Sequence, residues 1–131
     1  MHRAIINCNQ VQTEVISEGR WVEEDPLPHS SKNIVLIIPG NPGVPRFYEG
    51  FMKALNSRLT SDTPVWIIGH AGHVQPPKNL DIAMPSDDKW EEHYSLKAQI
   101  QHKVSSLLAL SINLLLSRNN VAIIYACRLR S

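Results

Sequence analysis

The chain has 131 residues, the size of one domain, and can bury about two thirds of the surface that its unfolded chain exposes. Basic and acidic side chains nearly balance, and the formal net charge of +1 gives no electrostatic case for binding nucleic acid. Most of the nine prolines fall between periodic segments, which is typical of an ordered chain.

Two short strands are predicted first. Residues Arg3 to Asn9 and Gln12 to Ser17 alternate weakly between polar and apolar side chains, so we expect two edge strands joined by a turn near Asn9-Gln10. The polar connection that follows contains Trp21, which we expect to cap the core.

A β-α-β unit is predicted next. Ile34 to Ile38 is an unbroken run of branched apolar residues, typical of a strand buried on both faces, and we expect it to be the central strand. Arg46 to Leu59 is predicted to be a helix and Pro64 to Ile68 a second buried strand, a layout that places ligand sites at the carboxyl ends of strands. The apolar stripe of the helix recurs every four residues, at Phe47, Phe51, Leu55 and Leu59.

A second helix and a third strand complete the chain. Asp88 and Glu91 have the spacing of a capping pair at the start of a helix that runs toward Leu116, and Val121 to Ala126 is predicted to be a buried strand. The apolar stretch within this helix is shorter than the roughly 20 residues that a membrane span needs, although a segment lying on a membrane surface stays open. The apolar face consists of Leu96, Ile100, Val104, Leu107 and Leu108.

The loop Pro39 to Gly43 is the first candidate site. Its prolines make it rigid and its glycines permit close approach, so it can aim a main-chain N–H at a substrate oxygen, as an oxyanion hole requires. Pro42 has no N–H, which makes Asn41 the first candidate donor and Gly40 the second. An ordinary tight turn is the alternative. The loop lacks the lysine and hydroxyl residue of a phosphate-binding loop.

The loop Gly69 to His73 is the second candidate site. It is similar to a nucleophile elbow, but Ala71 stands where the nucleophile would be. His70 and His73 are three residues apart on a loop, without a cysteine or an acidic residue at ligand spacing. We therefore expect both histidines to line a cleft, and we expect no metal and no cofactor. A small metal-dependent enzyme is the alternative.

The two cysteines are predicted to be free thiols in a reducing compartment, because Cys8 and Cys127 have no metal or redox spacing. Cys127 follows an apolar strand, where a hydrolase would present its nucleophile. Tyr125 and Leu129, however, stand where an elbow needs small residues, and no acid or histidine follows. We predict a buried structural cysteine.

These segments together resemble the lipid droplet-associated hydrolases, a family of α/β hydrolases. The implied fold class is α/β, a partial α/β-hydrolase fold with a mostly parallel sheet, flanking helices and N-terminal edge strands. The resemblance covers roughly Trp21 to Lys103. It rests, in order, on Ile37 to Gly43, Phe47-Tyr48, Lys53 to Leu55, Pro64 to Trp66, Gly69 to His73 and Tyr94 to Lys103.

The family implies a serine hydrolase that acts on acyl and cholesterol esters of neutral lipids, on lipid droplets and the endoplasmic reticulum. Its Gly-His-Ser-x-Gly elbow lies just beyond the stretch that matches Gln99 to Lys103, and has no counterpart here. We therefore expect residues 1–103 to be the first part of a hydrolase domain. Residues 104–131 are expected to be a divergent apolar tail, helix and then strand, of a shortened or alternatively ended product. Only the oxyanion role of Asn41 carries over by position.

Two hypotheses for function follow. In the first, the chain is a family member without activity, because the nucleophile and its acid and histidine partners are absent. In the second, it is a non-catalytic fragment that binds the surface of a lipid droplet or membrane through an exposed strand edge and apolar helix faces. The expected partners are an acyl ester or neutral lipid and the droplet surface, without nucleic acid or metal. A cytosolic location for the shortened chain stays open.

Overall fold

The computed structural model describes residues 1–21, 33–60, 63–74, 78, 89–115 and 120–125. Its elements are, in chain order, β1 His2–Cys8, β2 Val11–Glu18, β3 Asn33–Ile38, the 3-10 helix η1 Pro45–Tyr48, α1 Glu49–Asn56, β4 Val65–Ile68, α2 Trp90–Tyr94, α3 Leu96–Leu115 and β5 Asn120–Tyr125. No described helix has the length and apolar character needed to cross a membrane.

The five strands form one mixed sheet in the order β1-β2-β4-β3-β5. The pairs β1/β2 and β2/β4 are antiparallel, whereas β3 pairs in parallel with β4 and β5. The prediction of a mostly parallel sheet was therefore wrong. β1 is an edge strand as predicted, but β2 lies inside the sheet, and β4 rather than β3 is the middle strand.

The antiparallel pairing of β1 with β2 follows from a tight turn. Asn9 and Gln10 both have positive φ, 52° and 65°, and connect β1 directly to β2. A two-residue turn of this hand matches the twist of an antiparallel hairpin, whereas parallel strands need a long crossover. The predicted turn at these two residues is confirmed.

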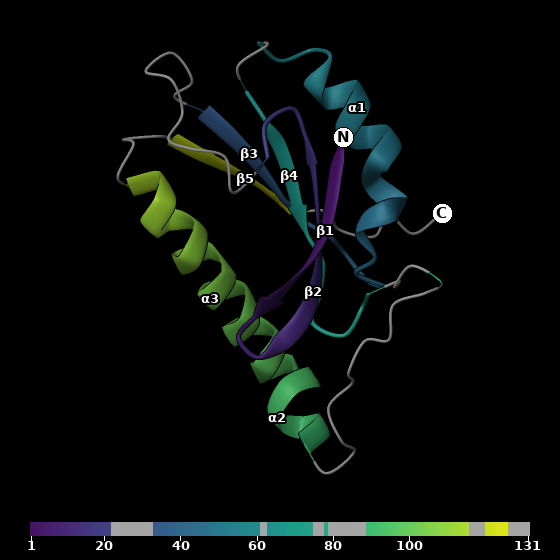
Figure 1. Cartoon of the computed structure of the whole chain (residues 1–131), viewed down its shortest axis with the longest axis vertical. Helices are drawn as coiled ribbons and strands as arrows, with labels where there is room; N and C mark the ends of the chain where they lie inside the picture. Colours follow the sequence, from purple (N-terminus) through teal and green to yellow (C-terminus); the bar gives the residue numbers. More distant parts are fainter. Residues whose placement is uncertain (22–32, 61–62, 75–77, 79–88, 116–119, 126–131) are drawn as a thin grey trace.

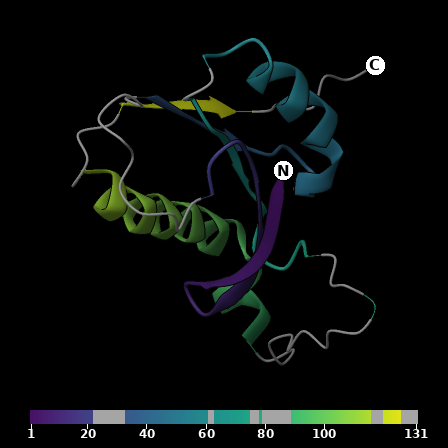
Figure 2. The ribbon, with the colours of Figure 1, turned by 45° about the horizontal axis from the view of Figure 1, so that its top comes forward.

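Helix α1 covers one face of the sheet, and α3 lies on the opposite side (Figures 1 and 2). The predicted stripe of the first helix is partly wrong, because Phe47 is 70% and Phe51 49% exposed. Steps of four residues advance about 40° around an α-helix, so a stripe counted that way drifts off the buried side. The side chains that pack on the sheet are Tyr48, Met52, Leu55 and Leu59.

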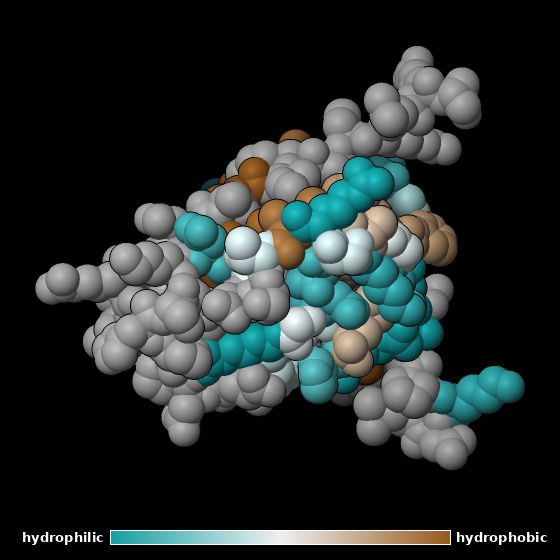
Figure 3. Space-filling model, turned by 90° about the horizontal axis from the view of Figure 1, so that it is seen from above, coloured by the Kyte–Doolittle hydropathy of each residue, from teal (hydrophilic) through white to brown (hydrophobic). Residues whose placement is uncertain are grey.

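The face of the sheet opposite α1 has its own apolar cluster. Val15, Leu36 and Trp66 are buried there, and Trp21 packs against them, so the predicted cap over the core is confirmed. The indole N–H of Trp66 donates a hydrogen bond to the main-chain oxygen of Arg20, at 2.8 Å. On the outer surface seen in Figure 3, hydrophobic residues (brown) are interspersed with hydrophilic ones (teal).

Helix α3 turns a polar side toward the sheet. His102 and Ser106 are buried, and both bond to side chains of the β1–β2 hairpin. The predicted apolar face is instead open to solvent, with large exposed fractions for Leu96 (78%), Ile100 (59%), Val104 (43%) and Leu108 (59%). Asp88 and the side chain of Leu107 lie outside the described residues.

The last described element is a strand, as predicted. β5 pairs in parallel with β3 from Asn33↔Asn120 to Ile38↔Tyr125 and forms the second edge of the described sheet. Ile123 is 41% exposed, so this strand is not buried along its whole length. Helix α3 runs through Lys103 without a break and β5 follows it, so the predicted division of the chain at residue 103 is not tested.

Candidate functional site

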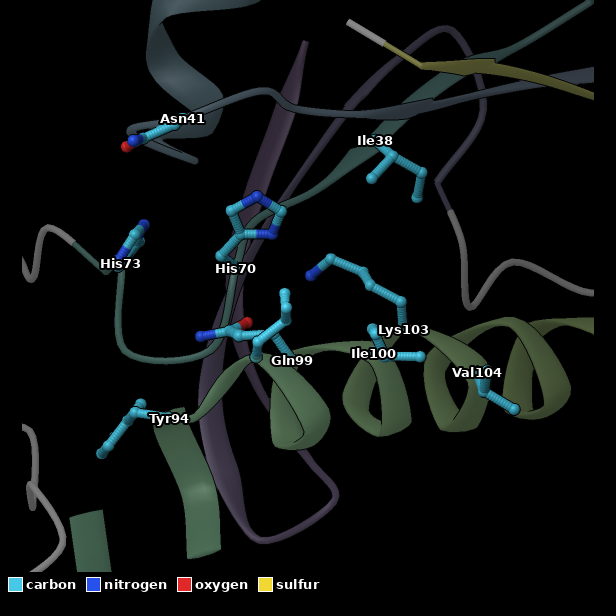
Figure 4. Close-up of a pocket in the computed structure, with 10 residues that line it drawn as sticks. Ile38, Asn41, His70, His73, Tyr94, Gln99, Ile100, Lys103 and Val104 are labelled. Carbon is cyan, nitrogen blue, oxygen red and sulfur yellow. The ribbon is translucent and has the colours of Figure 1, made fainter. Parts of the chain in front are cut away.

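A cavity of about 550 Å³ lies where β3 and β4 end, between the loops that follow these strands and the α2–α3 segment (Figure 4). Its volume is in the range of about 300–1,000 Å³ typical of small-molecule sites. The strands and loops contribute Ile38, Asn41, His70 and His73. The helices contribute Tyr94, Leu96, Gln99, Ile100, Lys103 and Val104.

The two candidate loops are in direct contact. The main-chain N–H of His70 donates to the oxygen of Gly43 at 3.3 Å. Gly43 has φ +75°, and a Cβ there would lie 2.2 Å from Cδ2 of His70 and 2.6 Å from Nδ1 of His73. Only glycine permits this approach, because the backbone angle and the space both exclude a side chain.

The main-chain N–H groups of the first loop differ in their partners. The N–H of Gly43 bonds back to the oxygen of Gly40 and closes the turn. The N–H of Gly40 donates to the hydroxyl of Tyr48 at 2.9 Å, so it is already used inside the chain. Asn41 is exposed, and within the described part of the chain its N–H has no hydrogen-bond partner.

Helix α3 holds the second loop through Gln99. The side-chain oxygen of Gln99 accepts from the N–H of Ala71, and its amide nitrogen donates to the oxygen of Ala71, both at 3.0 Å. Tyr94 packs beside the same loop, because a Cβ on Gly72 would come within 2.5 Å of its ring. The loop is thus fixed from the helix side as well as from Gly43.

His70 reaches the cavity from this loop. The pKa of His70 is lowered to about 4, mainly by burial and to a smaller extent by the nearby charges of Lys103 and His73. A hydrogen bond to the backbone of Pro39 raises this pKa and offsets part of the effect. Its Nδ1 is buried without a partner among the described groups. The rings of His70 and His73 meet edge to face, with centroids 5.8 Å apart. His70 is therefore a neutral side chain at neutral pH.

Buried hydrogen bonds behind the cavity define the tautomer of His102. The hydroxyl of Thr13 donates to the oxygen of Val11 at 3.1 Å and lies 2.7 Å from Nε2 of His102. Because that hydroxyl proton is used, Thr13 accepts from a protonated Nε2, and Nδ1 of His102 is left as an acceptor. Burial, with nearby Lys103 and His70, lowers the pKa of His102 to about 4, which agrees with a neutral ring.

Lys103 connects this hydrogen-bonded group to the cavity. Its ammonium donates to the oxygen of Gly69 and lies 3.2 Å from Nδ1 of His102. Burial lowers the pKa of Lys103 from 10.5 to about 8, so the group is mostly charged at neutral pH. Among the described residues it has no carboxylate partner. Figure 4 shows the side chain extending from α3 toward His70.

The structure brings the four predicted site residues together around one cavity or its loop, but neither their roles nor the expected absence of a metal is tested by this geometry. In the described part of the chain, no three histidine, cysteine or acidic side chains gather closely enough to hold a metal ion. Cys127 lies outside the described residues, whereas Cys8 is a buried free thiol as predicted.

Sequence reasoning missed Gln99, His102 and Lys103. They belong to a polar stripe on α3, together with Ser106, whose spacing of three and four residues matches one side of a helix. That spacing was the available signal, and the neighbouring apolar stripe obscured it because apolar residues are normally assigned to the buried side.

Comparison with known proteins identifies relatives that match most of the chain. The model of the family "Lipid-droplet associated hydrolase" matches residues 31–126. The lipid droplet-associated hydrolase of Drosophila melanogaster is 42% identical over 105 residues, which are 80% of this chain and 33% of that protein. The human protein of the same name is 38% identical over 113 residues, covering 82% of this chain and 35% of its own length.

Solved structures agree on the fold. Epoxide hydrolase VrEH1 from Vigna radiata superposes on 96% of this chain and 32% of its own, with a TM-score of 0.56 and 15% identity. A mutant of VrEH2 gives a TM-score of 0.55 at 16% identity. At such identities the likeness shows the fold alone, that of part of an α/β hydrolase.

The comparisons also show how much of the related proteins this chain covers. The chain spans about a third of the length of the curated relatives it matches. The family match runs past Lys103 to residue 126, further than the motifs recognised in the sequence. The division of the chain at residue 103 stays a prediction.

Proposed function

Because the chain belongs to the lipid-droplet associated hydrolase family, we propose that it carries the oxyanion-stabilising side of a serine hydrolase site for acyl and cholesterol esters. The main support is Asn41, a residue that lines the cavity and whose N–H has no partner in the described structure. Attack on an ester carbonyl places negative charge on its oxygen, and a fixed N–H donor at that point stabilises the transition state.

Gly40 would support the loop rather than act as the first donor to the substrate oxygen. Its N–H is committed to the hydroxyl of Tyr48, which fixes the loop at the end of β3. His70 and His73 line the same cavity and contribute to its shape. The substrate would enter along the apolar side chains of α3, and droplets and the endoplasmic reticulum are the proposed locations.

We further propose that the chain as it stands does not turn over esters. The sequence contains no Gly-x-Ser-x-Gly, and the loop most similar to such an elbow has Ala71 at its centre. Without a nucleophile the covalent step cannot occur, and an oxyanion donor alone leaves a small part of the rate enhancement.

A serine-directed fluorophosphonate tests this proposal. The purified full chain is incubated with the probe and its intact mass is measured, with an active serine hydrolase in the same tube as the positive control. We expect no added mass on the chain. Stoichiometric labelling that disappears after heat denaturation would overturn the proposal, and peptide mapping would then identify the labelled residue.

A second function, binding to a lipid surface without catalysis, is supported by the apolar face of α3. Four large side chains at intervals of four residues are exposed there, which is unusual for a helix packed on a sheet. Insertion of such a face into a lipid monolayer would bury it.

Flotation with phospholipid-coated triolein droplets tests the second function. We expect the unaltered chain to float with the droplets and the double variant Leu96→Ser/Leu108→Ser to stay in the aqueous phase. Lys97→Ser, an exposed position on the same helix, is the control and should float as the unaltered chain does. Equal recovery of all three in the aqueous phase would contradict this function.

A further inference from the structure

The ammonium of Lys103 has an unusual environment for a charged group. It is partly buried, and two of its three N–H groups have acceptors, the oxygen of Gly69 and Nδ1 of His102. Both acceptors are neutral. Buried charges in proteins are normally paired with an opposite charge, because leaving water without one is costly.

The remaining N–H of Lys103 has no acceptor among the described residues, and the side chain of Lys103 extends from α3 into the cavity (Figure 4). The wall next to it is apolar, formed by Ile38, Ile100 and Val104. A group that fits both features has one negative charge at its head and a hydrocarbon chain behind it.

We propose that this cavity is a binding site for a single-chain carboxylate, that is, a fatty acid anion, with its head on the ammonium of Lys103 and its chain along Ile38, Ile100 and Val104. Such binding needs no nucleophile, so it does not depend on the proposed hydrolase role. The ion pair would form in a partly dry site, where a charge-assisted hydrogen bond is strong.

A carboxylate fits better than a phosphate head. One carboxylate charge matches the single charge of Lys103, whereas a phosphate monoester carries about −1.5 to −2 at neutral pH. The excess charge would remain uncompensated beside the apolar side chains that line the cavity.

Calorimetry with four small ligands tests the proposal on the unaltered full chain. Sodium octanoate, 1-octanol, sodium acetate and octyl phosphate separate head group from hydrocarbon chain. We expect octanoate to bind once per chain, at least about tenfold more tightly than the other three, as one charge-assisted hydrogen bond implies. Equal affinity for octanoate and octanol would show an apolar groove without charge recognition, and tighter binding of octyl phosphate would show a phosphate site. Either result overturns the proposal.

Variants locate the site. Lys103→Met removes the charge and keeps most of the stem, and should weaken octanoate binding about tenfold while leaving octanol unchanged. Lys97→Met, on the same helix but exposed and away from the cavity, should change neither affinity. Retained octanoate affinity in Lys103→Met would overturn the proposal.

A structural check accompanies the variants. Circular dichroism monitors folding, and if Lys103→Met does not fold, the ligand comparison on the unaltered chain decides alone. The NMR signal of the His70 ring should shift when octanoate is added, because His70 lines the same cavity. An unshifted ring in the presence of bound octanoate would contradict the location.

Discussion

Single residues hold the two loops of the site together, and Gly43 is the clearest case. Gly43→Ala would force a Cβ into the His70 and His73 rings at a positive φ. We expect the free energy of unfolding to fall by roughly 1–3 kcal/mol, measured by urea denaturation. Gly50→Ala is the matched control in α1, where a Cβ meets nothing within 4 Å, and should stabilise by about 0.4–1 kcal/mol. Equal stability of Gly43→Ala and the unaltered chain would contradict the described loop contact.

Protonation of buried histidines predicts how stability depends on pH. Burial lowers the pKa of His102 from 6.5 to about 4. Between these two pH values the unfolded chain therefore binds a proton at this side chain that the folded chain does not bind. The free energy of unfolding should therefore decrease as the pH falls from about 6.5 to about 4.

His102→Gln tests the source of this slope, since glutamine can still donate to Thr13. Urea unfolding at pH 7 and pH 5 should show a smaller loss of stability in this variant, with part of the slope left to His70, whose pKa is lowered in the same direction. His2→Gln, at an exposed position, is the control. An unchanged slope in His102→Gln would refute the assignment.

At the scale of elements, α3 acts as the support of the Gly69–His73 loop. Gln99→Ala removes two hydrogen bonds to the main chain of Ala71, and we expect faster amide hydrogen exchange at Ala71 and a loss of about 1–3 kcal/mol in unfolding free energy. Gln101→Ala, an exposed position on the same helix, should leave that amide unchanged. Equal exchange rates of the Ala71 amide in both variants would show that the hydrogen bonds of Gln99 do not hold the loop.

The helices show which structural features could be predicted from the sequence and which could not. The positions of the two predicted helical regions and of the strands were predictable from hydrophobic runs and turn residues, but the division of the second region into α2 and α3 and the buried side of α1 and α3 were not. In the first helix, a count in steps of four selected Phe47 and Phe51 instead of Met52. In α3 the sheet is met by His102 and Ser106, because the facing hairpin presents Thr13 and Cys8 as hydrogen-bond partners. The periodicity of α3 alone does not show that the hairpin facing it is polar.

At the scale of the molecule, the class of fold and the neighbourhood of the site were predictable, whereas the pairing of strands was not. Ile34 to Ile38 and the loop after it have a local pattern that identifies a buried strand and its rigid turn. The antiparallel placement of β2 beside β4 depends on contacts between residues such as Val15 and Ile68, far apart in the chain. A local turn indicates that β1 pairs with β2, but no local pattern indicates that β2 also lies next to β4.

The role of β5 can be tested on the whole molecule. A chain that ends at Leu115 lacks β5 and leaves the hydrogen-bonding edge of β3 unpaired. Unpaired edges associate with one another, so we expect this chain to sediment as dimers or larger species in analytical ultracentrifugation and to unfold at lower urea concentration. A monomer as stable as the full chain would show that β5 contributes nothing to the sheet.

The central claim is that the loop after β3 offers the N–H of Asn41 to a developing negative charge. Amide NMR of the full chain during titration with diethyl phosphate, a monoanion with tetrahedral oxygens, tests it most directly. We predict that the Asn41 signal shifts most and that the Gly40 signal shifts little, because Gly40 is bonded to Tyr48. A titration in which Gly40 responds and Asn41 does not would contradict the account.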